Sequence, residues 1–198
     1  MTVQDILIEG RNYTDADLLK ALINMEKGDP LVAFKPAEVQ HLIEDISWVE
    51  RAEVSRRFPN TIYIRLYERV PYALWQHDGK VVVIDREGEV LTEKMRPEFE
   101  DLFLITGEDA NKHAEQIVSL LQTEALIMEE SEAAMRVGGR RWDLTLKNGM
   151  TVYLPEEDMG YALRRLADEQ EKTNIFAKDL QVIDLREPDR LIVQTHTR

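Results

Sequence analysis

The sequence contains no cysteine, which excludes disulfide bridges, cysteine-based zinc sites and cysteine nucleophiles. Basic residues are also few, because 25 Lys and Arg stand against 38 Asp and Glu and give a formal net charge of −13. A body of that charge repels a polyanion, so nucleic-acid binding is excluded as its general function. The longest hydrophobic runs contain four residues, as at 81–84 and 102–105, whereas a membrane span needs about 18. We therefore expect neither a membrane anchor nor a signal peptide within this sequence.

The composition is that of an ordinary globular protein rather than a disordered chain, with 43% hydrophobic and 32% charged residues. Typical domains contain about 100 to 150 residues, so a chain of 198 residues allows one large domain or two small ones. No linker rich in Gly, Ser or Pro interrupts the sequence, and the pattern changes near residues 68–71. We expect two domains, residues 1–70 and residues 71–198.

Residues 3–68 predict the order strand, helix, helix, strand, strand. A turn signal at residues 9–12 ends the first strand, and Thr14 with Asp17 three positions later resembles a helix capping box. Pro36 suits the first turn of the second helix. Alternation in the two closing strands predicts that Arg65 faces solvent. The same alternation places Ile62, Ile64 and Leu66 inward. It puts Ala52, Val54 and Phe58 together on one face of the preceding strand, residues 51–58.

Residues 71–198 predict a second unit of short strands and two helices. Asp78-Gly79 and Asn148-Gly149 are hairpin signals. Apolar residues at helical spacing predict helices over about 109–122 and around 159–166. Strands are expected at residues 72–76, 80–84, 135–137, 142–146, 150–154, 180–185 and 191–195.

Catalytic chemistry finds no support in the sequence. The four histidines, at positions 41, 77, 113 and 196, are scattered and form no His-Glu-x-x-His motif. No serine stands in a Gly-x-Ser-x-Gly elbow, and Gly138-Gly139 lacks the lysine of a phosphate loop. Carboxylate pairs such as Glu129-Glu130 and residues 156–158 would need a cleft to act as acid and base. We predict no catalytic residue, no metal site and no cofactor.

Several sequence blocks resemble a known family. They read ILIEGRNYTDADLLKAL, GDPLVAF, ISWVERAEVSRRFPNTIYIRLYERVPYALW and VVVIDREGEVL, followed more thinly by RRWDLTLKNGMTVYLP and VIDLREPDRLIVQ. Together they are similar to the extracytoplasmic region of the bacterial cell-division family FtsQ/DivIB. The resemblance implies an α+β fold, in which a POTRA domain of order β-α-α-β-β precedes a mixed, mainly antiparallel β domain with flanking helices.

The resemblance also implies a protein-binding surface near the C-terminus. Members of this family are adaptors that dock the extracytoplasmic segments of FtsB and FtsL through the last strands, and septal synthase components are further possible partners. The closing strand is an edge candidate by itself, since little sequence follows it to cover its unpaired backbone groups. Carried over to this sequence, the partner-binding residues are Arg140, Arg141, Arg186, Glu187, Asp189, Arg190, Leu191, Ile192, Val193 and Thr195.

This surface departs from the family pattern in one place. Asp184-Leu185-Arg186 matches the family motif, but residues 187–190 read Glu-Pro-Asp-Arg where well-known members carry Tyr-x-Ser-Gly. Thr195 stands where those members end the strand in tryptophan. A second interaction face, on the strand of residues 51–58, corresponds to Arg51, Val54 and Arg56.

The resemblance therefore predicts a non-enzymatic scaffold that recruits partners at the division site. It implies a single-pass type II membrane protein at the periplasmic face of the inner membrane, held by an anchor that is absent from this chain. A POTRA-bearing chaperone-like module of outer-membrane protein assembly or secretion is the alternative, and it predicts tandem POTRA repeats or a barrel. A third hypothesis, an acidic hydrolase, rests only on the number of carboxylates.

Overall fold

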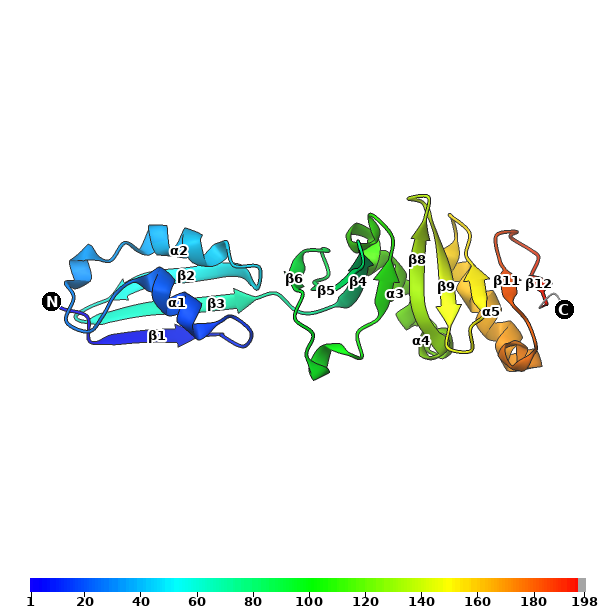
Figure 1. Cartoon of the computed structure of the whole chain (residues 1–198), viewed down its shortest axis with the longest axis horizontal. Coiled ribbons are helices and arrows are strands. Elements are labelled where there is room, and N and C mark those ends of the chain that lie inside the picture. Colours follow the sequence, from blue (N-terminus) through cyan, green and yellow to red (C-terminus); the bar gives the residue numbers. More distant parts are fainter. Residues whose placement is uncertain (196–198) are drawn as a thin grey trace. The chain divides into compact units, whose positions relative to one another are not determined.

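A computed structural model describes residues 1–195 and divides the chain into two compact units (Figure 1). The first unit is Met1–Val70 and the second begins at Pro71. Each unit has its own hydrophobic core.

The first unit is a three-stranded sheet in the order β1-β3-β2, with two helices on one face (Figure 1). Strand β1 pairs with β3 in parallel, and β2 pairs with β3 antiparallel. The order strand, helix, helix, strand, strand is confirmed. The elements are β1 (Asp5–Glu9), α1 (Ala16–Ile23), the 3₁₀ helix η1 (Leu31–Ala33), α2 (Pro36–Glu44), β2 (Val49–Arg57) and β3 (Thr61–Glu68).

The core of this unit lies between the helices and the inner face of the sheet. Ile62, Ile64 and Leu66 alternate inward along β3 and are at most 3% exposed, whereas Arg65 is exposed. They pack with Leu19 and other buried residues of the two helices. The predicted side-chain register of β3 is confirmed.

Two local predictions in this unit are wrong. The N-cap of α1 is Asp15, whose carboxylate accepts the Leu18 N–H, and not Thr14. Thr14 is fully buried, and its N–H and hydroxyl both donate to the Glu68 carboxylate at the end of β3, so its hydroxyl is not available to cap the helix. Phe58 was expected within the strand, on the same face as Ala52 and Val54, but β2 ends at Arg57, and Phe58 is 66% exposed at the start of the connection to β3.

The second unit is a nine-stranded mixed sheet in the order β12-β11-β10-β9-β8-β7-β4-β5-β6. Most neighbours are antiparallel, but β4 with β7, β7 with β8 and β10 with β11 are parallel. The expected mixed, mainly antiparallel sheet is confirmed. Its strands are β4 (Ala73–His77), β5 (Lys80–Ile84), β6 (Val90–Thr92), β7 (Leu104–Thr106), β8 (Ser131–Val137), β9 (Arg141–Leu146), β10 (Thr151–Tyr153), β11 (Val182–Asp184) and β12 (Ile192–Gln194).

The helices of this unit cover one face of the sheet, behind the strands in Figure 1. Trp142, Leu144 and Leu146 alternate along β9 toward them and are fully buried in their shared core. The other face of β9, β10 and β11 carries mainly polar side chains, among them Asp143, Tyr153 and Asp184. The helical elements are η2 (Pro97–Phe99), η3 (Ala110–His113), α3 (Ala114–Thr123), α4 (Ala125–Glu130), α5 (Met159–Thr173) and η4 (Ile175–Ala177).

Two boundaries differ from the sequence expectation. The helix expected over 109–122 is a 3₁₀ turn followed by α3, although Ile117, Val118 and Leu121 are buried at the expected spacing. Strand β8 begins at Ser131 rather than at residue 135, because its first half pairs with the end of β9. The Asn148-Gly149 hairpin does join β9 to β10, and Gly149 adopts the positive φ of 87° that the turn requires.

Candidate protein-binding surfaces

Strand β12 forms one edge of the nine-stranded sheet and pairs only with β11. The Gln194 carbonyl accepts a hydrogen bond from the Gln181 N–H at 2.8 Å, so the polar groups of Gln194 face β11. Backbone N–H and C=O groups alternate in direction along an antiparallel strand. Val193 therefore directs its N–H and C=O away from the sheet, where a further strand would pair.

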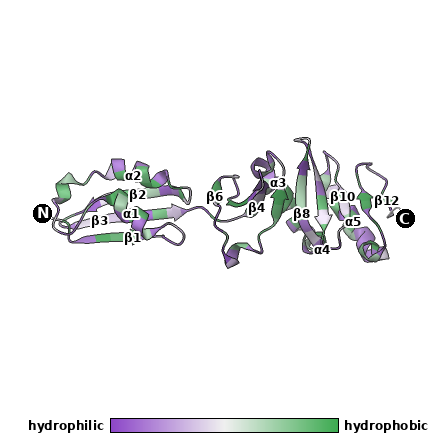
Figure 2. Cartoon of the chain, viewed as in Figure 1, coloured by the Kyte–Doolittle hydropathy of each residue, from purple (hydrophilic) through white to green (hydrophobic). Residues whose placement is uncertain are grey.

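The side chains of this edge strand are apolar and open to solvent. Ile192 is 43% and Val193 is 45% exposed, and β12 carries hydrophobic colouring in Figure 2. Leu191 packs partly against the core, while Thr195 lies exposed just beyond the strand. An exposed apolar edge with unpaired backbone groups is the kind of site that accepts a partner strand.

The turn before β12 is tied to α5. The Arg190 N–H donates to the Glu187 carbonyl at 3.3 Å, and the Arg165 guanidinium donates to the Pro188 carbonyl. The side chains of Glu187, Asp189 and Arg190 are exposed. Beside this turn lies a cavity of 410 Å³, lined by residues of the turn, of α5 and of the segment before α5, including Arg186, Tyr161 and Glu156.

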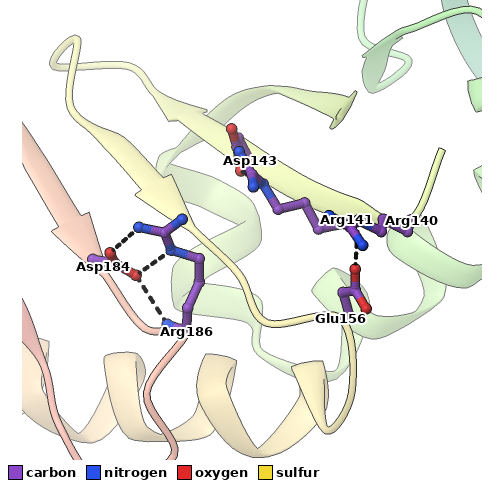
Figure 3. Close-up of polar contacts among 6 residues, drawn as sticks. All are labelled: Arg140, Arg141, Asp143, Glu156, Asp184 and Arg186. Atoms are coloured by element: carbon purple, nitrogen blue, oxygen red, sulfur yellow. Dashed lines mark hydrogen bonds and ion pairs between the residues drawn. The ribbon is translucent and has the colours of Figure 1, made fainter. Parts of the chain in front are cut away.

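Arg186 is held in place by Asp184, two residues earlier (Figure 3). The Asp184 carboxylate accepts hydrogen bonds from the backbone N–H and the Nε of Arg186, at 3.0 and 2.9 Å. These bonds from Arg186 lower the pKa of Asp184. The guanidinium also lies 5.1 Å from the ring centre of Tyr153 on the neighbouring strand. Arg186 is therefore a fixed cation on the polar face of the sheet.

Arg140 and Arg141 have separate acidic neighbours (Figure 3). Arg140 is an exposed residue whose Nε lies 2.7 Å from Glu156. The Arg141 Nε lies 3.4 Å from Asp143 Oδ1, close enough for attraction but without hydrogen-bond geometry. The Asp143 side chain is only 7% exposed, and this burial raises its pKa despite the nearby arginine.

Strand pairing places the two arginine–aspartate pairs, Arg141–Asp143 and Asp184–Arg186, close to each other. Asp143 pairs with Tyr153, and Tyr153 pairs with Asp184, so the three side chains form one row across β9, β10 and β11. Arg141 and Arg186 flank that row. The sequence prediction named both arginines as partner-binding residues but did not include the two aspartates that partly neutralise them. The available signal was the i, i+2 spacing, which places both members of each pair on one face of a strand.

The second predicted face lies on β2, which is an edge strand of the first unit. Arg51 is paired with Glu53 at 3.0 Å. Val54 is half-buried beside the core, and the Arg56 guanidinium donates to the Phe34 carbonyl at 2.6 and 2.9 Å. A cavity of 410 Å³ runs along this edge, between β2 and Gln40 of α2.

No catalytic arrangement emerges within residues 1–195. These residues hold no cluster of three or more His, Asp or Glu side chains suited to a metal ion. A polar cavity of 840 Å³ is lined in part by His77, Asp109 and Arg136, but Arg136 already pairs with Asp109 at 3.1 Å. His196, one of the four scattered histidines, lies outside the described residues.

Comparison with known proteins accounts for both units. The POTRA domain of FtsQ type matches residues 1–69, and the C-terminal part of the cell division protein FtsQ/DivIB matches residues 73–186. The chain belongs to the FtsQ/DivIB family. The resemblance inferred from the sequence blocks is confirmed.

Individual relatives agree over nearly the whole chain. The cell division protein FtsQ of Rickettsia conorii is 33% identical over 194 residues, which cover 98% of this chain and 72% of that protein. FtsQ of Rickettsia prowazekii is 34% identical over 195 residues, with the same coverage. FtsQ of Rhizobium meliloti is 34% identical over 193 residues, or 97% of this chain and 62% of that protein.

Family membership assigns the chain a scaffold role in cell division, within a family of division adaptors. Among the described residues, no helix combines the length and the apolar character that a bilayer crossing requires.

Proposed function

We propose that this protein is a divisome adaptor that docks the extracytoplasmic segments of FtsB- and FtsL-like proteins at the division septum, on the periplasmic face of the cytoplasmic membrane. In this role it assembles partners and regulates septal wall synthesis without catalysing a reaction. Septal synthase components are further candidate partners. The supporting observation is the free edge of β12, where Val193 directs its N–H and C=O outward between exposed apolar side chains.

Docking proceeds by strand addition at β12. Main-chain hydrogen bonds to Val193 supply affinity, and the exposed side chains of Ile192 and Val193 supply apolar contact. The charged neighbours select the partner. Arg186 and Arg141 face a partner across the polar face of β9–β11, Arg140 and Arg190 lie at the rim, and Glu187 and Asp189 repel acidic segments from the turn.

Paired proline variants test this proposal. Val193→Pro removes an outward N–H and should abolish capture of FtsB-like and FtsL-like domains while circular dichroism stays native. Ile192→Pro removes an N–H that faces β11, so it should damage the ladder and lower stability. Val193→Ala keeps the N–H and should retain most of the binding. Undiminished capture by a folded Val193→Pro variant would place the docking surface elsewhere.

The β2 face is proposed as a second docking surface. Its candidate residues are Arg51, Val54 and Arg56, and the cavity along the β2 edge supports it. Val54→Pro should weaken capture of a partner that uses this face and leave capture through β12 unchanged.

A further inference from the structure

The free edge of β2 is occupied at one point by a side chain of its own domain. The Ala52 N–H donates to Glu44 Oε1 at 3.0 Å, and Gln40 donates to the same oxygen at 3.2 Å. The bond from Ala52 is the main cause that lowers the pKa of Glu44, so this carboxylate is ionised at neutral pH. Glu44 ends α2, which packs against β2. The N–H of Ala52 must therefore point away from β3.

Alternation fixes the direction of the next backbone groups. Ala52, Val54 and Arg56 stand opposite Leu66, Ile64 and Ile62 in an uninterrupted register. Because outward groups recur at every second residue, the N–H groups of Val54 and Arg56 also point away from β3. Residues 1–195 supply no partner across the edge for either group. The edge thus offers two free N–H groups, followed by one that is already bonded.

The charges along this edge are unevenly distributed. Near Ala52 lie Glu44 and the Arg51–Glu53 ion pair, which leave no excess of positive charge. At the other end, the Arg57 guanidinium lies 3.2 Å from the centre of the Tyr63 ring, and Arg56 bonds only a carbonyl. Within the described residues, neither of these two arginines has a carboxylate partner. That end of the edge favours an acidic side chain.

We propose that Glu44 sets the register of strand addition at β2, so that this edge takes a short extended segment that pairs with Val54 and Arg56 and carries a carboxylate opposite Arg57. The inference rests on the proposed second docking surface and adds which kind of partner segment that surface selects. Glu44 acts as a positioning residue, because it excludes a partner from Ala52 and does not itself contact the paired groups. Partner residues that extend past Val54 toward Ala52 form no backbone hydrogen bond with β2 and therefore add no affinity.

A length series of peptides tests the register. The probes are synthetic peptides of alternating threonine and valine, from about four to about eight residues, with one glutamate at either end. Affinity for the wild-type protein should rise with length and stop rising once Val54 and Arg56 are paired. In Glu44→Ala the rise should continue for about two more residues, by roughly threefold to tenfold, the effect of about one further net hydrogen bond.

Two variants control this experiment. Glu44→Gln keeps an oxygen that can accept the Ala52 N–H and should show the wild-type plateau. Glu38→Ala removes an exposed carboxylate of the same helix that pairs with Lys35, and it should also show the wild-type plateau. A plateau at the same length in Glu44→Ala and in wild type would overturn the inference, as would failure of all peptides to bind any of these proteins.

Amide exchange gives a readout that needs no peptide. The Ala52 amide should exchange more slowly than the amides of Val54 and Arg56 in the wild-type protein, and as fast as they do in Glu44→Ala. Equal exchange at all three sites in wild type would overturn the inference. A protein that shows the expected plateau but captures no division protein would retain the register inference and refute the proposed function.

The charge preference is tested at Arg57. Arg57→Gln should reduce the advantage of the glutamate peptides over their glutamine counterparts at least threefold at low salt. Arg65→Gln is the matched control, because Arg65 lies on the same face but on the central strand. An equal loss in both variants would show that the selection comes from the general charge of the face and not from the end of the edge.

Discussion

Strands β2 and β12 each close one side of a sheet, but their free edges are protected to different degrees. β2 has nine residues, is covered on its inner side by α2 and has one outward N–H held by Glu44. β12 has three residues, both of its faces are exposed, and the described residues place nothing across its outer edge. The short β12 leaves its outer backbone groups open to a partner strand, whereas the longer β2 is packed by its own domain, which already occupies one of its outward N–H groups.

The largest expected effect tests the side-chain register of β3, because the outward directions of the Val54 and Arg56 N–H groups in β2 were assigned from its pairing with β3. Ile64 stands opposite Val54 and is fully buried, so Ile64→Asp places an unpaired charge in the core. We expect a loss of about 4 kcal/mol or more, which unfolds the first unit. Arg65→Asp should cost far less because Arg65 is exposed. Similar melting temperatures for the two variants would show that the assigned register is wrong by one residue.

Separate folding of the two units is the next test. Residues 1–70 expressed alone should show a cooperative thermal transition, since their core is contained within Met1–Val70. A gradual melt with dye-accessible hydrophobic surface would mean that β2 owes its order to the second unit. In that case the contrast between the two edges would fail.

Glu68 should have an intermediate effect that is confined to the first unit. Burial raises the pKa of Glu68, but hydrogen bonds from Thr14, Tyr13 and Asn12 outweigh it and leave the pKa below its usual 4.5. Glu68→Ala should cost about 2 kcal/mol at pH 7. Because the folded-state pKa is lowered, this contribution is fully present above about pH 4.5 and is lost as the pH falls further. Denaturation between pH 7 and pH 3 measures both effects, and a Glu68→Ala deficit that does not shrink as the pH falls would contradict the assignment.

Two aspartates beside the β12 surface should respond in opposite directions. Asp184 has a lowered pKa through Arg186, so Asp184→Asn should destabilise by about 1 kcal/mol at pH 7, an effect lost as the pH falls through the folded pKa. Asp143 has a raised pKa through burial, which means that its charge is unfavourable in the folded protein. Asp143→Asn should leave stability unchanged or raise it by up to about 1 kcal/mol. Loss of stability in both variants would contradict the opposite pKa shifts assigned to Asp184 and Asp143.

The smallest expected effect concerns long-range charge at the β12 edge. Arg190→Glu should weaken partner capture by about threefold at low salt and have almost no effect at high salt, because exposed charges are screened within about 10 Å at 0.1 M. Lys94→Glu is the control, since Lys94 is exposed just beyond β6 at the opposite end of the same sheet. Equal losses in the two variants would indicate a general charge effect rather than a docking surface.

Local patterns in the sequence determined much of the secondary structure and the core of this protein. The period of two in β3 predicted Ile64 inward and Arg65 outward, and helical spacing predicted the buried residues of α3, because both depend only on the geometry of one element. The characteristic sequence blocks then identified the family, which the comparisons confirmed.

Tertiary structure alone decided which polar groups are available. Glu68 takes the hydrogen bonds of Thr14 from 54 residues away and thereby moves the helix cap to Asp15. Glu44 reaches the Ala52 N–H only because α2 packs on β2, and the pKa of Asp143 rises because its side chain is buried in the folded sheet. Hydrogen bonding and desolvation depend on groups that are distant along the chain, so no local pattern could have predicted which edge N–H is free and which is already bonded.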